Sequence, residues 1–392
     1  MSFWRALTIF SGLSVIMPLI TDICLPAIPN MAEYYGVETG RIQQTISYLF
    51  IGAALGQIIY GPLADRYGRK PVIVISMIIF TLISFLTIYT ATPSSHSLAR
   101  FFQGATGAGG MIIVRAIIRD LYDSKNATKM LAYTMIGGGL MPILAPIVGG
   151  HITNLFGWKP NFLIIAVFGL ALTLSLVLWL KESGEEDKKA LQITEIFKSF
   201  VILFKSKIFV YYTIITIGPF AGLLCILAGL STVLIDLMGI STSSFGYYFA
   251  IIMIGNLLAS VAAGKLANLL DSFKLISIGA IICFLSGFTA CVLAVFGSMN
   301  PFSIVLPAAG FMIGFPLVVS AATAEAMSPF GLIAGKASSM IGFIQLGCGA
   351  LTSLILGSVS NNTQLPLVIA LSLSGTLTII ALWAVYKLKY KG

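Results

Sequence analysis

Long apolar runs follow one another along almost the whole chain, and only short polar turns separate them. Of the 392 residues, 58% are hydrophobic and only 9% are charged, so lipid is the solvent that decides the fold. A helix needs roughly 20 apolar residues to cross a bilayer. The sequence therefore predicts an all-α integral membrane protein whose twelve transmembrane helices cover residues 5–25, 42–60, 72–89, 95–119, 127–150, 162–180, 209–235, 244–270, 275–296, 302–325, 333–359 and 365–386.

One long polar segment, residues 181–207, interrupts this pattern after the sixth span. We therefore expect a six-helix bundle over residues 1–181, a cytoplasmic linker over 182–207 and a second six-helix bundle over 208–392. Within the linker, residues 193–204 space their apolar side chains as a helix does, which predicts a helix lying on the membrane surface. A faint repeat, GPLAD at 61–65 and GKLAN at 264–268, suggests pseudo-symmetric halves, which is typical of transporters.

The positions of lysine and arginine predict how the chain threads the membrane. Nineteen of the 23 basic residues fall in alternate loops and at both ends, and only Arg41 and Lys159 fall in the other loops. Cytoplasmic loops carry the excess of basic residues, so both termini are predicted to be cytoplasmic. The net charge of +9 is explained by this asymmetry, and no nucleic-acid partner is expected. The five cysteines show no spacing typical of metal ligands and are expected to pack as small apolar residues.

The turn after the second span, GPLADRYGRKP at 61–71, resembles the signature of the major facilitator superfamily. Residues 21–29, TDICLPAIP, and 100–104, RFFQG, resemble signatures of its bicyclomycin and chloramphenicol resistance branch of drug/proton antiporters. Residues 139–150 are similar to an antiporter signature of the fifth span, with Ala145 where many members have glycine. The segments at 157–162 and 334–338 fit the same branch, although Lys336 replaces a residue that is usually small.

The resemblance implies a transporter rather than an enzyme. It implies two six-helix bundles that work by alternating access and export small, largely apolar or weakly polar compounds, such as drugs, across a bacterial inner membrane in exchange for protons. No cofactor or metal is expected, and the expected partners are a small-molecule substrate, protons and the bilayer around a monomer. An alternative on the same fold is a transporter of a specific metabolite or siderophore, including an importer. A membrane enzyme or sensor lacks support, because we find no nucleotide-binding loop or metal-ligand cluster.

Asp22 is the only acid well inside the first six spans, and a carboxylate in lipid is a functional candidate by default. Arg100 lies at a comparable depth in the fourth span, and a buried guanidinium needs a carboxylate or backbone carbonyls. We therefore predict that Asp22 carries the proton and pairs with Arg100, while Gln103 shares the network or lines the cavity. The alternatives are a carboxylate near the outer interface and an arginine that only bonds the carbonyls of a helix end.

The basic turn is predicted to form a cytoplasmic gate, largely through the resemblance. Asp65 would pair with Lys336 at the start of the eleventh span when the inner side is closed, and Arg69 would pair with Asp120. The alternative is that the turn only sets orientation. The expected gate residues are Gly61, Asp65, Arg66, Gly68, Arg69, Asp120 and Lys336.

Glycine and proline in the fifth span predict either a hinge that seals against the other half or simple close packing. The residues concerned are Gly139, Pro142, Pro146, Gly149 and Gly150. The second half carries no charge at mid-membrane, since Asp236 and Glu325 are expected at exposed helix ends, and His96 and His151 lie at outer helix ends without a catalytic partner. Aromatic residues are the candidates for the cavity wall of the second half: Tyr211, Tyr212, Phe220, Tyr247, Tyr248, Phe311 and Phe315.

Overall fold

The computed structural model describes residues 3–184, 193–359 and 363–391, and within these ranges the chain is helical with no strand. Twelve of the described helices are long and apolar enough to cross a membrane, as predicted. The helices of the first half are α1 (Phe3–Asp22), the short η1 (Leu25–Ala27) and α2 (Ile28–Tyr35) that continue it, α3 (Thr39–Tyr67), α4 (Arg69–Thr87), α5 (Pro93–Leu121), α6 (Ser124–Phe156) and α7 (Lys159–Trp179).

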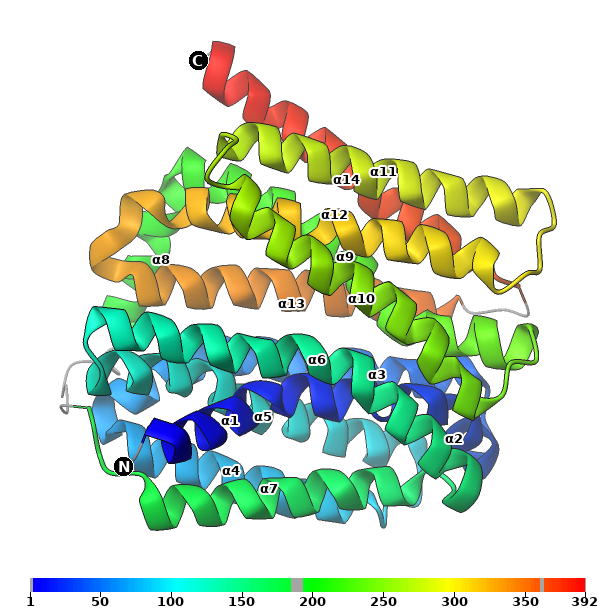
Figure 1. The fold of residues 1–392 in the computed structure, drawn as a ribbon, viewed down its shortest axis with the longest axis horizontal. Helices are drawn as coiled ribbons and strands as arrows, with labels where there is room; N and C mark the ends of the chain where they lie inside the picture. The colour runs from blue at the N-terminus through cyan, green and yellow to red at the C-terminus, as the bar shows by residue number, and fades with distance from the viewer. Residues whose placement is uncertain (1–2, 185–192, 360–362, 392) are drawn as a thin grey trace.

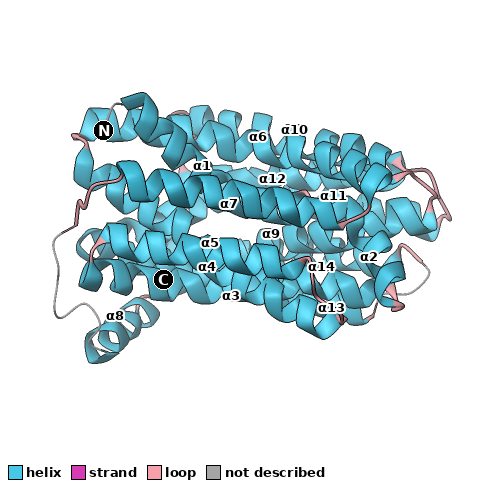
Figure 2. Cartoon of the chain, turned by 90° about the horizontal axis from the view of Figure 1, so that it is seen from below, coloured by secondary structure: helices cyan, strands magenta, loops and turns pink. Residues whose placement is uncertain are grey.

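A helix outside the spans, α8 (Ile193–Lys205), connects the halves and lies at the edge of the molecule (Figure 2). Its bounds agree with the helix expected at 193–204. The helices of the second half are α9 (Lys207–Ser231), which continues into the π-helical turn η2 (Thr232–Leu237), α10 (Thr242–Leu266), α11 (Ser272–Val295), α12 (Phe302–Met327), the 3₁₀ turn η3 (Ser328–Ile333), α13 (Ala334–Ser358) and α14 (Leu365–Lys391).

Short polar side chains cap the N-terminal ends of several of these helices. The Thr92 hydroxyl accepts a hydrogen bond from the Ser95 N–H at 3.1 Å, and the Ser95 hydroxyl accepts one from the Thr92 N–H at 3.2 Å, which forms a capping box for α5. Asp271 accepts from the Lys274 N–H at 2.7 Å and begins α11. These caps satisfy amides that the helices leave free, so the spans begin close to the predicted positions.

The spans form two six-helix bundles that lie side by side (Figure 1). In the first bundle α3 packs on α5, α4 on α7 and α1 on α6, and in the second α11 packs on α12 and on α14. The bundles meet where α3 packs on α13 and where α6 packs on α10. The N-terminal end of α1, the C-terminal end of α14 and α8 lie at the same end of the molecule, which the positions of the basic residues predict to be the cytoplasmic end.

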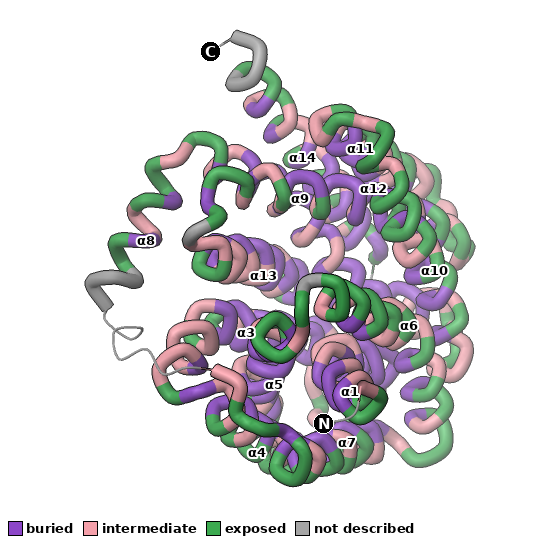
Figure 3. The backbone as a smooth tube through the Cα atoms, turned by 60° about the vertical axis from the view of Figure 1, so that its left-hand side comes forward, coloured by how far each residue is buried: buried purple, intermediate pink, exposed green. Residues whose placement is uncertain are grey.

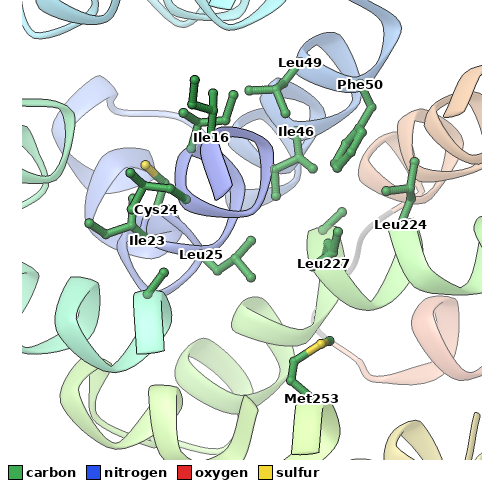
Figure 4. Packing of buried hydrophobic residues seen from close by; sticks show 14 of the residues in the cluster. Ile16, Ile23, Cys24, Leu25, Ile46, Leu49, Phe50, Leu224, Leu227 and Met253 are labelled. Atoms are coloured by element: carbon green, nitrogen blue, oxygen red, sulfur yellow. The ribbon is translucent and has the colours of Figure 1, made fainter. Parts of the chain in front are cut away.

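Buried residues face the interior of the bundles, and exposed residues line the perimeter (Figure 3). The perimeter is strongly apolar: Leu82, Leu178, Leu258 and Leu373 are all more than half exposed. A soluble protein rarely exposes so much apolar surface, but a membrane span faces hydrocarbon there. Inside, one apolar cluster crosses from one bundle to the other, and Leu25 of η1 lies on the side that faces Leu227 of α9 and Met253 of α10 (Figure 4).

The two bundles are pressed together in their outer halves. A Cβ atom on Gly150 of α6 would lie 2.3 Å from the Thr242 carbonyl oxygen, and one on Gly357 of α13 would lie 2.9 Å from the Gly40 carbonyl oxygen. A Cβ atom on Gly61 or Gly335, near the cytoplasmic ends of α3 and α13, would meet no atom within 4 Å. The structure is therefore closed on the outer side, and neither Gly61 nor Gly335 makes a comparable contact near the cytoplasmic ends of α3 and α13.

Candidate functional site

Asp22 is the last residue of α1 and lies inside the first bundle. Its side chain is only 3% exposed, and it makes no hydrogen bond or ion pair with any residue that the structure describes. The following peptide is enclosed as well, because a Cβ atom on Gly149 of α6 would lie 2.0 Å from the Ile23 carbonyl oxygen. An ionised carboxylate in this position would have no compensating charge among the described residues, so its burial would be costly.

Arg100 does not pair with Asp22 in this structure, so the predicted pair stays a prediction for another state. Its guanidinium donates to the Ile20 carbonyl oxygen at 2.9 Å and to the Gln103 side-chain oxygen at 2.6 Å, and it lies 5.6 Å from the centre of the Phe162 ring. The Ile20 carbonyl is free because α1 ends within the next turn and leaves its last carbonyls without helical partners. Arg100 thus satisfies a helix end, which is the alternative that the sequence left open.

Gln103 holds this arrangement in place from the same helix. Its amide nitrogen donates to the Ser84 hydroxyl of α4 at 2.8 Å, and both side chains are buried. His96, one turn before Arg100, lies at the outer start of α5 as expected but is wholly buried between Tyr35, Trp158 and Phe162. Arg100 is therefore held by two hydrogen bonds and a ring contact, while Asp22, two residues beyond Ile20, makes no hydrogen bond with a residue that the structure describes.

At the cytoplasmic end, the basic turn forms a compact ion-pair group. Arg69 bonds Asp65 four residues earlier and reaches Asp120 of α5 at 3.3 Å, so the predicted pair between Arg69 and Asp120 is present. Arg66 points elsewhere and lies over the ring of Tyr67 at 5.6 Å. The turn thus joins α3, α4 and α5 within the first bundle.

Lys336 does not contact Asp65 in this structure. Its ammonium group donates instead to the Ser199 hydroxyl of α8 at 3.0 Å. The predicted pair belongs to a state with a closed inner side, whereas here the outer side is closed. The Asp65–Lys336 latch therefore stays a prediction for the opposite state.

Glu182 is a member of the cytoplasmic group that the sequence does not reveal, because it lies in the charged run at the start of the linker. Its carboxylate accepts from the Arg69 and Lys70 N–H groups at 2.8 and 3.1 Å, and from the Ser183 and Gly184 N–H groups at 2.9 and 3.0 Å. Arg69 and Lys70 are the first residues of α4, so Glu182 caps this helix from the start of the linker.

The conformation and surroundings of Gly68 require a glycine at this position of the turn. Gly68 has a φ of +91°, and a Cβ atom there would lie 2.7 Å from a Glu182 carboxylate oxygen. Both the backbone conformation and the close carboxylate exclude a side chain. The glycine of the basic turn is thus required by a residue more than a hundred positions later in the chain.

Replacing Glu182 with glutamine is expected to lower the free energy of unfolding by about 0.5–1 kcal/mol, a modest value because the side chain is exposed. Burial raises the pKa of Glu182, but its four backbone N–H donors outweigh this and hold the pKa below its ordinary value of 4.5. A depressed pKa stabilises the fold above pH 4.5, and this contribution is lost as the pH falls through the lower value of the folded state. Thermal unfolding of the purified Glu182→Gln and unaltered proteins at several pH values measures this contribution to stability.

The matched control is Glu33→Gln, which alters an exposed carboxylate of α2 that bonds no described residue. It should leave the unfolding temperature unchanged at every pH. If Glu182→Gln also had no effect at neutral pH, the four hydrogen bonds would contribute nothing to stability and the cap would have no role.

The glycines and prolines of the predicted seal lie on two faces of α6. Gly150 packs against Thr242, Gly139 faces Leu257, and Pro146 and Ile147 meet Gly246 of α10, where a Cβ atom would lie 2.5 Å from the Ile147 Cα. Gly149 instead packs on Ile23 within its own bundle. The helix is continuous through Pro142 and Pro146. Close approach to the other bundle is therefore observed, and the hinge stays a prediction.

The aromatic candidates for the cavity wall separate into several environments. Phe311 is wholly buried beneath Gly222, and Tyr212 is 7% exposed within the second bundle, so neither can line a cavity in this state. Tyr247 is 54% exposed and reaches His151 at 3.2 Å, at the outer ends of α10 and α6. Phe220 and Phe315 form a partly exposed edge-to-face pair with ring centres 5.2 Å apart, and Tyr211 and Tyr248 are also half-buried.

Comparisons with known proteins agree with this architecture. Residues 10–357 match the family described as the Major Facilitator Superfamily. A bicyclomycin resistance protein homolog of Haemophilus influenzae is 27% identical over 94% of this chain and 93% of its own length. Multidrug resistance protein D of Escherichia coli is 29% identical over 78% of this chain and 76% of its own length. The crystal structure of a D-xylose-proton symporter covers 99% of this chain and 98% of its own with a TM-score of 0.83, and at 14% identity it shows a shared fold.

These matches confirm the main predictions from the sequence. The matching family consists of membrane transporters, so the chain is a transporter of small molecules and not an enzyme, and transporters of this kind need no cofactor. The relatives fit the bicyclomycin resistance branch that the motifs indicated. The match covers all but the last few dozen residues and the first few. The chain belongs to the Major Facilitator Superfamily.

Proposed function

We propose that the protein is a proton-coupled antiporter that exports small, largely apolar or weakly polar compounds across the inner membrane of a bacterium. Relatives named for resistance to bicyclomycin and to multiple drugs support export of drug-like compounds. The observation that carries proton coupling is the isolation of Asp22, which is buried in a transmembrane bundle and forms no ion pair with any described residue. Such groups in membrane proteins mark proton or ion pathways.

In this proposal, the present state is the one in which Asp22 holds a proton. Protonation removes the charge and therefore the need for a partner, so Arg100 is free to bond Ile20 and Gln103. Substrate that enters from the cytoplasm favours release of this proton to the cytoplasm, and the carboxylate then attracts Arg100. When the outer side opens, Asp22 takes up a proton from the acidic outside and releases Arg100 again. The proton thus decides which partner Arg100 takes.

The cytoplasmic group would close the inner side in the other half of the cycle. Lys336 would leave Ser199 and join Asp65, while Arg69 keeps Asp120. Substrate would then sit between the bundles, where Phe220 and Phe315 offer an apolar wall. The two bundles, residues 1–181 and 208–392, would move as units about the linker, and the protein would act as a monomer.

Everted proteoliposomes with an acidic interior test the proposal. In this orientation the interior corresponds to the outside of the cell, so an exporter should take up chloramphenicol or bicyclomycin while protons leave. A pH-sensitive dye inside the vesicles and radiolabelled compound measure both fluxes. Vesicles that contain Asp22→Asn protein are the control.

The alternative is a transporter of a specific metabolite or siderophore, including an importer. In that case right-side-out vesicles would accumulate substrate, and the drug panel would move no protons in either orientation. The first bundle offers Arg100 as a buried cation, but both of its terminal nitrogens already donate to protein oxygens, which disfavours a strongly anionic cargo. We therefore favour drug export.

A further inference from the structure

Three polar side chains on one face of α3 reach across the boundary into the second bundle. Thr39 donates to an Asp236 carboxylate oxygen at 2.8 Å, Gln43 donates to the Thr232 hydroxyl, and the Ser47 hydroxyl lies 2.9 Å from that of Ser353. Positions 39, 43 and 47 are four residues apart and therefore form one row along the helix. We call these three pairs the outer ladder: Thr39–Asp236, Gln43–Thr232 and Ser47–Ser353.

The partners on the second bundle depend on an unusual piece of backbone. Thr232 and Asp236 both belong to η2, a π-helical turn that ends the seventh span. Because a π-helix bonds residue i to i+5, residues four and five apart share a face, and both side chains can point toward α3. Single π-helical turns are rare and frequently occur at functional sites. The turn thus matches the spacing of the ladder on α3.

The ladder passes from water into the protein interior. Thr39 and Asp236 lie at the outer mouth and Asp236 is exposed, whereas Gln43 is 1% exposed and Ser47 and Ser353 are 0% exposed. The backbones are close at the same level, since a Cβ atom on Gly357 would lie 2.9 Å from the Gly40 carbonyl oxygen. The two inner hydrogen bonds are therefore shielded from water, and all three form because the bundles touch.

A permanent interface in a membrane protein gains little from buried polar rows, because apolar packing satisfies the same surface without a desolvation penalty. A junction that opens to water has a different requirement. When the bundles separate, hydrogen bonds to water replace those between the bundles. The free energy of opening a polar ladder is therefore small. Together with His151–Tyr247, these pairs are the hydrogen bonds that join the bundles within the described residues, and all lie in the outer half.

We propose that the outer ladder is the extracellular gate of this transporter, with η2 as the element that sets its register. The ladder holds the outer side closed in the present state and breaks in the outward-open state. Asp236 thereby gains a role as a gate residue that its exposed position had hidden. The inference rests on alternating access but not on proton coupling or on the identity of the substrate.

Distances between spin labels test the gate. Cysteines at Leu155 and Phe296, which are 70% and 84% exposed at the outer ends of the two bundles, carry the labels after the partly exposed Cys291 and Cys348 are replaced by alanine. Gln43→Leu and Thr39→Val should each increase the population of a longer distance between the two labels. The labelled protein without these changes should populate that distance only weakly. Thr45→Val is the matched control, because Thr45 is a buried threonine of α3 that bonds only the Ile42 carbonyl of its own helix.

A disulfide across the ladder supplies the second test. Ser47→Cys with Ser353→Cys places two sulfurs where the hydroxyl oxygens lie 2.9 Å apart, so an oxidant should join the bundles. Hydrogen exchange of the outer ends of α3 and α13 should then slow at least severalfold and recover with dithiothreitol, while neither single variant responds to oxidation.

Two results would overturn the gate. One is a Gln43→Leu protein whose label distances equal those of Thr45→Val. The other is hydrogen exchange that is the same in the oxidised and reduced double-cysteine protein. Neither measurement involves a substrate or a pH gradient, so a failure of the proposed antiport and a failure of the gate can be told apart.

Discussion

Replacing Asp22 with asparagine is expected to reduce transport driven by a pH gradient by roughly 10²-fold or more, because asparagine cannot take up or release a proton. The side chains have nearly the same shape, and Asp22 makes no hydrogen bond or ion pair with a described residue that the change could break. The unfolding temperature should therefore stay the same or rise. Substrate uptake and proton flux in everted proteoliposomes, together with thermal unfolding, measure the two effects separately.

The matched control for Asp22 is Thr21→Val. Thr21 is the preceding residue, is equally buried, and donates only to the Met17 carbonyl of its own helix at 2.8 Å. This variant should keep coupled transport. Full pH-driven transport by a well-folded Asp22→Asn protein would remove Asp22 from the proton pathway and with it the main support for antiport.

Gly150→Val is expected to prevent closure of the outer side. A Cβ atom at this position would lie 2.3 Å from the Thr242 carbonyl oxygen of the other bundle, a contact that forces the two backbones apart. Overpacking of this kind costs about 1–3 kcal/mol, which corresponds to a roughly 5- to 150-fold shift toward the outward-open state. The outer label distances should lengthen, and transport should fall because one half of the cycle becomes inaccessible.

Gly138→Val provides the control on the same helix, because a Cβ atom on Gly138 would meet no atom within 4 Å. It adds the same bulk and the same loss of backbone freedom but no contact with the second bundle. Transport and label distances should resemble those of the unaltered protein. Equal effects of the two valines would mean that α6 responds to lost flexibility and not to contact with α10.

The spans and their direction could be predicted because the bilayer restricts the chain so strongly. Twenty apolar residues between polar turns allow only a helix, and the distribution of lysine and arginine then orients it. The pair between Arg69 and Asp120 was also predictable, since the resemblance placed both residues at the cytoplasmic ends of neighbouring helices. Proline and glycine indicated a closely packed α6, which the Gly150 and Gly139 contacts confirm.

The partner of Arg100 could not be read from the sequence, because two kinds of acceptor compete. A carboxylate at matching depth and the free carbonyls at the end of α1 both satisfy a guanidinium, and only the three-dimensional path of α1 brings Ile20 within 2.9 Å. The choice also depends on whether Asp22 is charged. A single sequence represents all states of the transporter, whereas one structure represents one of them.

The outer ladder and the Glu182 cap were missed for a different reason. Each joins residues that are far apart in the chain, Thr39 to Asp236 and Glu182 to Arg69, through a serine, threonine, glutamine or linker glutamate that looks ordinary by itself. The four-residue spacing of Thr39, Gln43 and Ser47 on a helix was the one available signal. A polar row within an otherwise apolar span is therefore a feature to examine even when it carries no charge.

Gly149 and Gly150 are neighbours on α6 but pack against different parts of the protein. One packs against the peptide that follows Asp22, and the other packs against the opposite bundle, with about 1.5 Å of helix rise between them. When the bundles separate as units, Gly150 loses its contact with Thr242, while Gly149 and Ile23 move together within the first bundle. In the proposed antiport, the peptide beside Asp22 and the seal against the second bundle are thus connected through one short stretch of α6 backbone, with no relay of side chains across the bundle.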